Sequence, residues 1–404
     1  MAKKILLINT TFTNGGASGV ARSLFFDLKD QNISMYFAYG RGEKSLEKNT
    51  FKFGNSFETI LHILFVRFLG LEGYGSYFST RKLINYIKKE KFDAVNLHNL
   101  HGYYLNYFYF FKFLNKSGIP IIWTLHDEWP LTWLPAHSMG CNHCKTGVGN
   151  CTNSYSYPKT YNKLFLKFFL RRKQNLLSSI NNIIFTPTPK WLKDEISKSY
   201  LKDKETRVIY YGVNPDLFSP SNRKIEIRKK YNIPNNKKVI LFSAANLNDE
   251  NKGVGDVLKV ADILVSREYF FIGIGKGVLP KKENVITVGY IDNNKSLSEL
   301  FAIADLFCIT SRAETQPLVV LEAFSSGVPV VGFDIVALRE LVNNNVGDLA
   351  SFSDIQKLSD IIVSNLVESV HKEKSQNARN LSTTTFSKDI FLKNYLEIYN
   401  EILR

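Results

Sequence analysis

The stretch ETQPLVVLEAFSSGVPVV, residues 314–331, holds two glutamates eight positions apart with a proline between them. Pro317 lacks a backbone donor and is barred from a helix interior, but it suits a first turn. We therefore expect Glu314 in a loop after a strand, Pro317 at the first turn of a helix, and Glu322 inside that helix. A helix start offers N–H groups and a positive dipole end. The stretch thus predicts a binding site for a phosphorylated, hydroxyl-rich ligand. The alternative is a surface glutamate beside a core-edge helix.

The segments around this stretch alternate short apolar runs with amphipathic ones, which is the strand–loop–helix rhythm of a parallel sheet. The strands predicted in the C-terminal half are KKVILFSAAN (237–246), YFFIGIGKG (269–277), NVITVGYI (284–291), ADLFCITSRAE (304–314) and VPVVGFD (328–334). Those predicted in the N-terminal half are KILLIN (4–9), FDAVNLHN (92–99), IPIIWTLHD (119–127) and INNIIFTPTP (180–189). In such sheets, ligands bind at the carboxyl ends of the strands.

This pattern predicts two Rossmann-like, doubly wound α/β domains facing a cleft. Residues 206–224 are rich in Gly, Pro and Asn and are typical of a linker, after which the strand pattern restarts. The tail, residues 386–404, has apolar residues at helical spacing. We expect an N-terminal domain over 1–206, a C-terminal domain over 207–384, and a closing helix over 385–404 that packs back on the N-terminal domain.

The composition is that of a globular protein with a basic balance: 404 residues, 44% hydrophobic, net charge +15 and pI about 9.4. A basic balance favours nucleic acid, anionic membranes or phosphorylated substrates. KLFLKFFLRRK, residues 163–173, has five Lys/Arg and no acid, and LHILFVRFLGL from Leu61 is apolar with one Arg. Such stretches suit a membrane surface. The alternative is a helix packed on its own domain with its lysines outward. No nucleic-acid motif accompanies the charge.

Export and membrane-spanning signals are missing from the sequence. The amino-terminal MAKKILLINTTFTNGG has too short an apolar run for a signal peptide, and no stretch approaches about 18 uncharged apolar residues. Four cysteines in 404 residues fit a reducing compartment rather than a disulfide scaffold. We therefore expect a cytoplasmic protein without a transmembrane helix, in peripheral contact with the inner face of the membrane.

Histidines and an aspartate stand at two predicted strand ends. His98 follows one strand, and His126 and Asp127 follow the next. A histidine there can donate a hydrogen bond or handle a proton near neutral pH. A structural His–Asp pair is the alternative for His126 and Asp127. His98 and His101, which share the LHNLHGYY segment, are less specific candidates than His126.

Two glycine-rich segments could approach a phosphate. Gly15, Gly16 and Gly19 lie between the first strand and the helix after it, where backbone N–H groups can contact a phosphate. Their spacing is not G-x-G-x-x-G, so a dinucleotide site is not supported, and a tight turn is the alternative. GIGKG, residues 273–277, has no clear acidic residue about 20 positions later. We interpret it as a turn at a strand end.

Two cations could balance a diphosphate in the C-terminal half. Lys252 follows a predicted strand and precedes a predicted helix, where its charge could neutralise a diphosphate. Arg312 stands two residues before Glu314 and could do the same. The alternatives are a solvated lysine and a surface arginine.

Cys141, Cys144 and Cys151 give the spacing C-x2-C-x6-C, with His143 among them. Three thiolates and an imidazole can form a tetrahedral zinc site. A second C-x-x-C is missing, so reduced loop cysteines are the alternative. Cys308, in the apolar run DLFCIT, is expected to be a buried thiol.

Together these segments resemble the retaining glycosyltransferases of family 4, also called group 1. ETQPLVVLEAFSSGVPVV is similar to the E-x7-E segment of that family, NGGASGVARSL to its amino-terminal glycine loop, and VIYYGVNPDLFSP to its interdomain segment. WTLHDEWPLTW with the cysteine loop resembles the colanic-acid and exopolysaccharide subgroup. The resemblance implies a GT-B architecture and transfer of a sugar from a nucleotide-diphosphate sugar, with retention. No cofactor or metal beyond this donor is implied for the transfer.

The resemblance also implies roles for individual residues on the donor side. Glu322 would bind the ribose hydroxyls, and Glu314 would contact the donor sugar. Gly16, beside Gly15, would meet the diphosphate. The backbone at Leu318 and Val319 would also hold the diphosphate or the sugar.

On the acceptor side, the resemblance implies that His126 faces the transferred sugar and, with Glu314, is a catalytic residue. His98 and Asp127 are acceptor-side candidates. Three departures from the family pattern stand out, one of them in the cysteine loop, where Pro135 and Val148 stand at positions at which Cys is usual. Asn246 stands where an Arg is usual, so neutralisation of the diphosphate would depend on Lys252, with Arg312. Trp133 stands where a Gly is usual.

We therefore predict a hexosyltransferase that extends a glycan acceptor, which we expect to be lipid-linked, in the biosynthesis of a bacterial surface polysaccharide such as an exopolysaccharide, lipopolysaccharide or capsule. A catalytically inactive GT-B-like scaffold in a polysaccharide assembly complex is the main alternative. A sugar phosphorylase or epimerase would use the same cleft. We expect nucleotide-sugar, glycan acceptor and anionic membrane as partners, and no nucleic acid.

Overall fold

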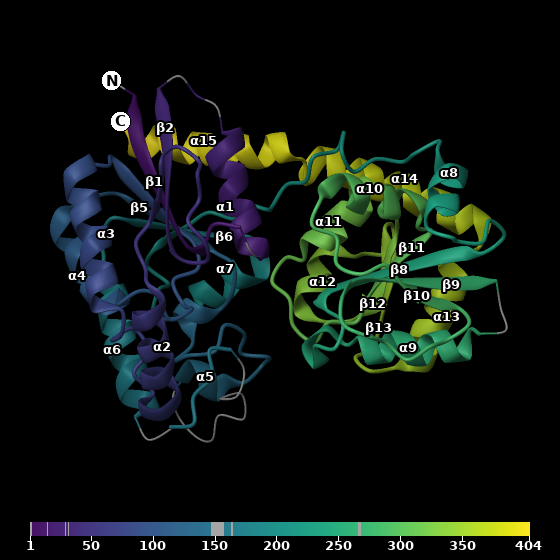
Figure 1. Cartoon of the computed structure of the whole chain (residues 1–404), viewed down its shortest axis with the longest axis horizontal. Helices are drawn as coiled ribbons and strands as arrows, with labels where there is room; N and C mark the ends of the chain where they lie inside the picture. Colours follow the sequence, from purple (N-terminus) through teal and green to yellow (C-terminus); the bar gives the residue numbers. More distant parts are fainter. Residues whose placement is uncertain are drawn as a thin grey trace. The chain divides into compact units, whose positions relative to one another are not determined.

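The computed structural model describes residues 2–13, 15–28, 30, 32–146, 157–162, 165–265 and 268–404. The chain divides into two units. The first comprises Met1–Ile209 with Leu392–Arg404, and the second comprises Tyr210–Phe391. Each unit is a parallel sheet with helices around it (Figure 1). The boundaries lie a few residues after those expected at 206 and 384.

The first unit contains a seven-stranded sheet in the order β3-β2-β1-β4-β5-β6-β7. Every neighbouring pair is parallel. The strands are β1 (Lys3–Thr11), β2 (Ile33–Arg41), β3 (Thr50–Lys52), β4 (Ala94–Leu97), β5 (Ile121–Leu125), β6 (Ile183–Pro187) and β7 (Glu205–Thr206). The central strands are apolar on both faces because helices cover a parallel sheet on both sides. Every residue of β4, β5 and β6 is buried.

Helices connect these strands. They are α1 (Gly16–Asp27), α2 (Ser56–Leu64), the π-helix η1 (Phe65–Leu69), α3 (Tyr77–Glu90), α4 (Tyr107–Ser117), the 3₁₀-helix η2 (Trp129–Leu131), α5 (Asn142–Thr146), α6 (Leu166–Ser178) and α7 (Lys190–Ser197). The first unit also receives most of the last helix of the chain, α15 (Lys388–Ile402). Buried tyrosines of α15 fix it to the first sheet: Asn96 donates to Tyr399 Oη (2.7 Å), and Tyr395 Oη lies 2.8 Å from Thr124 Oγ1.

The second unit contains a six-stranded parallel sheet in the order β10-β9-β8-β11-β12-β13. Its strands are β8 (Lys238–Asn246), β9 (Tyr269–Lys276), β10 (Val285–Thr287), β11 (Leu306–Ile309), β12 (Val330–Phe333) and β13 (Gly347–Ala350). Its helices are α8 (Lys224–Lys230), η3 (Glu250–Lys252), α9 (Val254–Ile263), α10 (Asn294–Ile303), α11 (Leu318–Ser325), α12 (Val336–Leu341), α13 (Ile355–Asn365) and α14 (Glu368–Thr385).

The expected α/β class with two parallel sheets is confirmed, and each of the nine predicted strands overlaps an observed one. The sequence pattern missed β2, β3, β7 and β13. The first of these, ISMYFAYGR, mixes polar and aromatic residues, and β3 and β7 have three and two residues. Such short or mixed segments carry too little periodicity to be recognised.

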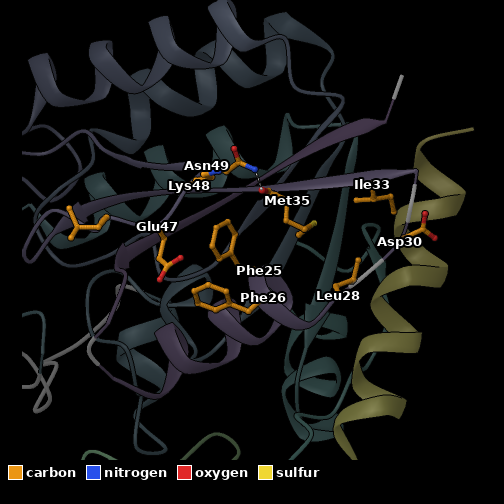
Figure 2. A pocket seen from close by; sticks show the side chains of 10 residues that line it. Phe25, Phe26, Leu28, Asp30, Ile33, Met35, Glu47, Lys48 and Asn49 are labelled. Carbon is orange, nitrogen blue, oxygen red and sulfur yellow. Dashed lines mark hydrogen bonds between the residues drawn. The ribbon is translucent and has the colours of Figure 1, made fainter.

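A hollow of about 900 Å³ opens beside α1 and β2 (Figure 2). Phe25, Phe26 and Met35 line it, and the Asn49 amide donates to the Met35 carbonyl (3.4 Å). It is lined by none of the residues that the sequence pattern predicted for a site.

Candidate functional site

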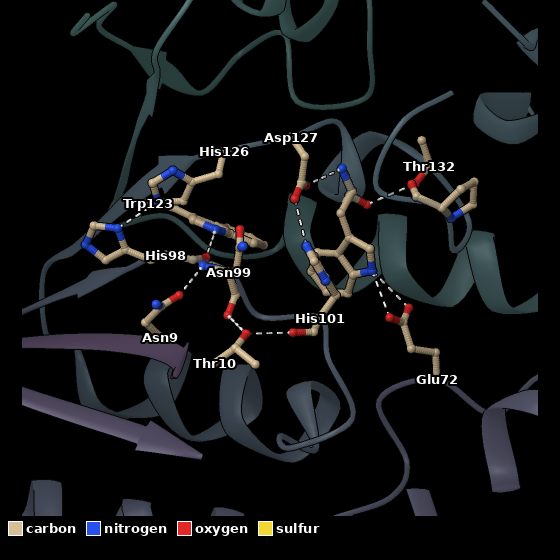
Figure 3. A network of polar contacts seen from close by, with 12 residues as sticks. Asn9, Thr10, Glu72, His98, Asn99, His101, Trp123, His126, Asp127 and Thr132 are labelled. Carbon is tan, nitrogen blue, oxygen red and sulfur yellow. Dashed lines mark hydrogen bonds and ion pairs between the residues drawn. The ribbon is translucent and has the colours of Figure 1, made fainter. Parts of the chain in front are cut away.

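His98 and His126 meet at the carboxyl edge of the first sheet. His98 directly follows β4 and His126 directly follows β5, and these strands are neighbours. Their rings are stacked, with centroids 5.1 Å apart, and His98 Nδ1 lies 2.8 Å from His126 Nε2 (Figure 3). The parallel sheet thus brings together two residues that are far apart in the sequence.

Both of these imidazoles favour the neutral form. Burial, together with the nearby His126, lowers the pKa of His98 well below its usual value. Burial also lowers the pKa of His126 to about 4, although the Asp127 charge opposes this shift. At neutral pH one ring therefore donates N–H and the other accepts. His98 Nε2 is buried without a hydrogen-bond partner among the described residues.

Asp127 pairs with His101, one of the two histidines that were the less specific candidates in the sequence. His101 Nε2 lies 2.7 Å from Asp127 Oδ2, and the backbone N–H of Trp129 donates to Asp127 Oδ1 (2.9 Å). Burial alone would raise the pKa of Asp127, but the charge and hydrogen bond of His101 outweigh burial and lower it. A structural His–Asp pair therefore exists here, with His101 as its histidine.

Trp129 joins two buried charges that the sequence analysis missed. Its indole N–H donates to both oxygens of Glu72, at 2.9 and 3.0 Å. Lys173 Nζ lies 3.4 Å from the centre of the ring and donates to the Trp129 carbonyl (2.6 Å). Burial raises the pKa of Glu72 to about 7, against the influence of Lys173. Burial lowers the pKa of Lys173 to about 7, against the influence of Glu72.

Lys173 corrects one expectation. The basic stretch 163–173 was interpreted as a membrane-facing or outward-facing surface, yet the side chain of Lys173 is 0% exposed. No local signal distinguishes it from the exposed Lys167 and Arg171, because its acceptors lie about 40 residues away along the chain. Residues 163 and 164 lie outside the described part of the structure.

Gly15 and Gly16 stand where a phosphate-binding turn was expected, at the start of α1. Gly15 precedes the helix with φ = 93°, a left-handed conformation that favours glycine. A side chain placed there would meet nothing within 4 Å, so the helix start opens on empty space. The Ser18 hydroxyl is engaged instead with Asn9 and Thr11, which tie the first turn of α1 to β1.

The decisive stretch forms a helix start in the second unit. Glu314 lies in the loop after β11, and Glu322 lies inside α11, as expected. Pro317 is the residue just before the helix rather than part of its first turn, with φ = −70° and ψ = 115°. The amides of Leu318 and Val319 therefore begin α11 without an acceptor inside it.

Lys252 and Glu314 form an ion pair beside this helix start, 2.7 Å apart. A close backbone approach holds them together. Gly253, with φ = 65°, has no room for a side chain, since a Cβ would lie 2.1 Å from the Thr310 carbonyl oxygen. The Thr310 hydroxyl donates back to the Gly253 carbonyl (2.8 Å). The chain segments that follow β8 and β11 are thus held in contact with each other.

Arg312 lies next to this pair but has a carboxylate partner of its own. Its Nη2 is 3.0 Å from Asp256 Oδ2, and its backbone N–H donates to the Asn251 carbonyl (2.8 Å). Asn246, at the end of β8, accepts from the Asn248 backbone N–H (3.1 Å) and therefore shapes the same turn. The sequence pattern gave no reason to expect Asp256 in this cluster.

Glu322 is a half-buried acid whose Oε2 atom is buried. Burial raises its pKa to about 7, and its Oε2 has no hydrogen-bond partner among the described residues. In the loop that leads into α11, Gln316 accepts from the Tyr211 backbone N–H (2.8 Å), a contact that the sequence did not indicate. A carboxylate whose acceptors are left open can receive hydroxyl donors from a ligand.

The cysteine loop gives the zinc hypothesis no support within the described residues. Cys144 is buried and Cys141 is partly buried beside α5, with His143 exposed on the same short helix. Cys151 lies outside the described residues. Among those described, no group of three or more His, Cys, Asp or Glu side chains could hold a metal ion. Cys308 is buried in β11, as expected, and burial raises the pKa of its thiol to about 12.

Comparison with known proteins gives two family matches. The family described as Glycosyltransferase Family 4 matches residues 14–217, and the one described as Glycosyl transferases group 1 matches residues 223–381. The two matches cover the two structural units in turn, with the strand ends of the first and the α11 segment of the second both included.

Three individual relatives are between 18% and 27% identical to this chain in sequence. The putative colanic acid biosynthesis glycosyl transferase WcaC of Escherichia coli is 22% identical, over 98% of this chain and 100% of its own. An uncharacterized 41.2 kDa protein in the cps region of Klebsiella pneumoniae is 27% identical over 78% of this chain and 81% of its own. Anabaena HepE, solved with UDP and glucose, is similar in fold: its TM-score is 0.68 at 18% identity, covering 99% of this chain and 100% of that one.

Proposed function

The chain belongs to glycosyltransferase family 4, and from that membership we propose that it transfers a sugar from a nucleotide-diphosphate sugar to a glycan acceptor with retention of configuration. The observation that carries the proposal is the cluster at the start of α11. There the cation Lys252, from the connection after β8, pairs with the Glu314 carboxylate in the loop after β11, and the open backbone amides and the Glu322 carboxylate belong to α11, which follows that loop. A phosphorylated, hydroxyl-rich ligand needs this combination.

Each donor-side residue has a proposed task. Glu322 accepts two hydroxyl hydrogens of the ribose, a role that suits a carboxylate whose Oε2 has no partner among the described residues. Glu314 contacts the donor sugar. Lys252 and Arg312 balance the diphosphate, and the amides of Leu318 and Val319 hold it by the geometry of a helix start.

The proposed step is a front-face transfer. The bond between the anomeric carbon and the diphosphate oxygen breaks, and the acceptor hydroxyl oxygen bonds to that carbon on the same face. The hydroxyl proton passes to the leaving diphosphate. Catalysis then depends on positioning and on stabilising the charge of the leaving group. His126, kept neutral by burial, donates or accepts a hydrogen bond at the transferred sugar. The glycine turn at Gly15 and Gly16 contacts the diphosphate.

The acceptor side is proposed to work at a lipid surface, on the strength of an exposed apolar area that we call the aromatic face. It consists of side chains of α2, η1, the segment leading into α6 and the first turn of α6: Phe57, Ile60, Leu61, Leu64, Phe65, Phe68, Leu69, Tyr161, Phe165 and Phe168. Its two halves are joined where the Tyr161 N–H donates to the Arg67 carbonyl (2.8 Å) and the rings of Phe68 and Tyr161 lie 6.0 Å apart.

Two properties of this face favour an anionic bilayer as its partner. Its members on α2 and η1 recur at three- and four-residue spacing, so they share one side of the helix. Arg67, Lys167 and Arg171 are exposed within or beside it and would meet lipid phosphates. Among the residues that the structure describes, no helix is long and apolar enough to cross a membrane. We propose peripheral attachment to the inner face of the cytoplasmic membrane and a lipid-linked acceptor.

The biological setting follows from the relatives. One is named for colanic acid biosynthesis, and two others are named for O-antigen biosynthesis. We therefore propose that this chain builds a bacterial surface polysaccharide. The donor is proposed to be a nucleotide-diphosphate hexose, in line with the UDP and glucose bound in the Anabaena HepE structure.

A thermal-shift panel of nucleotides and nucleotide-sugars, with wild type beside Glu322→Ala, tests the proposal. A ligand at about 100 times its Kd adds about 2.7 kcal/mol to stability. We expect one nucleotide family to raise the melting temperature of the wild type selectively, with the shift lost in the variant. If no donor shifts the wild type, the scaffold alternative, which the missing arginine at Asn246 favours, replaces this one.

A further inference from the structure

Trp129 is a junction between the acceptor-side residues and two buried charges. On one side, its backbone N–H donates to Asp127 Oδ1 (2.9 Å), and Asp127 in turn pairs with His101 (2.7 Å). On the other side, its indole N–H donates to both oxygens of Glu72, while Lys173 lies over the ring. Glu72, His101 and Asp127 are labelled in Figure 3, where dashed lines mark the contacts of this network.

The Lys173 ammonium fixes the backbone of the same loop. It donates to the carbonyl of Trp129 (2.6 Å) and to that of Thr132 (3.2 Å), so it bridges the two ends of the short helix η2. Water cannot replace these carbonyls as acceptors for the ammonium, because the Lys173 side chain is fully buried. Losing it would leave two carbonyls and the Glu72 carboxylate without their cation.

Both charges come from the segments that carry the aromatic face. Glu72 lies three residues after η1, and Lys173 lies on α6 five residues after Phe168. The loop that carries His126 and Asp127 is therefore held by contacts with the segments of the aromatic face as well as by its own strand, β5. Rigid, buried contacts of this kind transmit position because packed interiors do not deform smoothly.

Resting on the proposed function, we propose that Glu72 and Lys173 are positioning residues for sugar transfer. Through Trp129 they hold the loop that carries His126 and Asp127 in one geometry relative to the aromatic face. They do not touch the substrates. A displacement of about 1 Å in a reacting group can cost about 100-fold in rate, so loss of this support reduces acceptor turnover without reducing donor affinity.

Two variants test this role: Lys173→Met, and the double variant that combines it with Glu72→Gln. The matched control is Arg228→Met in the second unit, because Arg228 is also a buried cation that donates to backbone carbonyls, at 2.9 to 3.1 Å, and it lies outside the proposed site. For each protein we would measure the melting temperature, the donor Kd, and kcat and KM for the acceptor.

The expected result separates position from stability. Lys173→Met should lose stability and roughly 10- to 100-fold in acceptor kcat/KM, with the donor Kd unchanged. The double variant removes both buried charges, so it should regain stability while its acceptor kcat/KM remains low. Arg228→Met should lose stability only. If the double variant regains wild-type kcat/KM, or if activity follows melting temperature equally in Arg228→Met, the positioning role is overturned.

A second readout does not depend on transfer. The protein has seven histidines, so their side-chain NMR signals can be assigned by single substitutions. The signals of His101 and His126 should move in Lys173→Met and in the double variant, and stay in place in Arg228→Met. Unchanged signals in folded variants would refute the inference. A wild type that transfers no sugar from any donor would refute the proposed function and leave this NMR result to decide the inference.

Discussion

Lys252 and Glu314 meet 2.7 Å apart at the ends of two separate strand-to-helix connections. The cation proposed for the diphosphate is therefore already paired with the carboxylate proposed for the donor sugar. Both side chains are partly open to solvent, at 33% and 15% exposure, so the pair itself contributes little to stability. The pair would matter when a donor binds, because Lys252 would then contact the diphosphate as well as Glu314.

Removing Lys252 alone should harm donor binding more than removing both charges. In Lys252→Met, Glu314 remains opposite the incoming diphosphate, and two negative charges repel. We expect a loss in donor affinity of roughly tenfold or more for the single variant, and a smaller loss for Lys252→Met with Glu314→Gln. Calorimetric titration with the nucleotide-sugar measures both. Lys230→Met, which breaks an exposed pair with Glu299 in the same unit, is the control. Equal Kd values for the single variant and this control would contradict the prediction.

The pKa of about 7 for Glu322 gives donor binding a pH dependence with a defined sign. Between its usual pKa, 4.5, and about 7, the folded protein keeps a proton that the unfolded chain has lost. The free energy of unfolding should therefore fall as pH rises through this window. Ribose hydroxyls that donate to the carboxylate favour its ionised form, so donor affinity should rise as pH rises toward about 8.

The matched variant for this test is Glu322→Gln, which keeps the shape and removes the titration. Denaturant unfolding and donor titration at several pH values give both curves. We expect the wild-type curves to change across the window by more than those of the variant. Parallel curves for the two proteins would show that Glu322 does not titrate there.

The histidine pair should make the first unit sensitive to acid. The folded-state pKa of His126 is about 4, and that of His98 is lowered too, so the unfolded chain takes up protons first as pH falls below about 6.5. Stability contributed by the neutral pair is complete above that value and is lost as pH falls toward about 4. His126→Gln should flatten this loss, measured by urea unfolding across the window. The same flattening in His371→Gln, in the second unit, would speak against the assignment.

The sequence predicted well what depends on short-range pattern. The nine apolar runs became strands, and the proline in the decisive stretch marked the start of α11 within one residue. The strand-end rule also brought His98 and His126 to one edge of a sheet, because parallel strands all end on the same side. These inferences need only local periodicity and the geometry of a parallel sheet.

What the sequence could not predict depends on contacts between distant segments. Lys173 and its acceptor Trp129 are 44 residues apart, and Trp129 and Glu72 are 57 apart. A basic run such as 163–173 does not show which of its cations turns inward, since the deciding factor is an indole ring and two carbonyls elsewhere in the chain. The same limit hid the pairing of Asp127 with His101, because the adjacent His126 was the nearer partner in the sequence.

Tyr399 should stabilise the attachment of α15. Its hydroxyl accepts a hydrogen bond from the buried Asn96 amide, and Tyr399→Phe leaves that donor unsatisfied. We expect a loss of about 1–3 kcal/mol in the free energy of unfolding. All four tryptophans lie in the first unit, so their fluorescence reports on its unfolding directly. Tyr290→Phe, an exposed site in the second unit, should change stability by less than about 0.5 kcal/mol. An effect as small for Tyr399→Phe would contradict this account.

The aromatic face should govern binding to anionic bilayers. Phe57, Phe68 and Phe168 are 71%, 61% and 54% exposed, so replacing them by serine removes apolar area without opening the core. Burial of each ring in a bilayer interface contributes on the order of 1–3 kcal/mol. We expect the triple variant to lose at least roughly tenfold in affinity for vesicles that contain anionic lipid, measured by co-sedimentation, with donor affinity unchanged. Ile225→Ser with Val278→Ser, exposed apolar sites in the second unit, is the control and should bind vesicles as the wild type does.

Binding that depends on the anionic lipid fraction but not on the three phenylalanines would assign attachment to the basic side chains alone. Equal binding to neutral and anionic vesicles would remove those basic side chains from the account, and no binding to either would refute the proposed lipid surface.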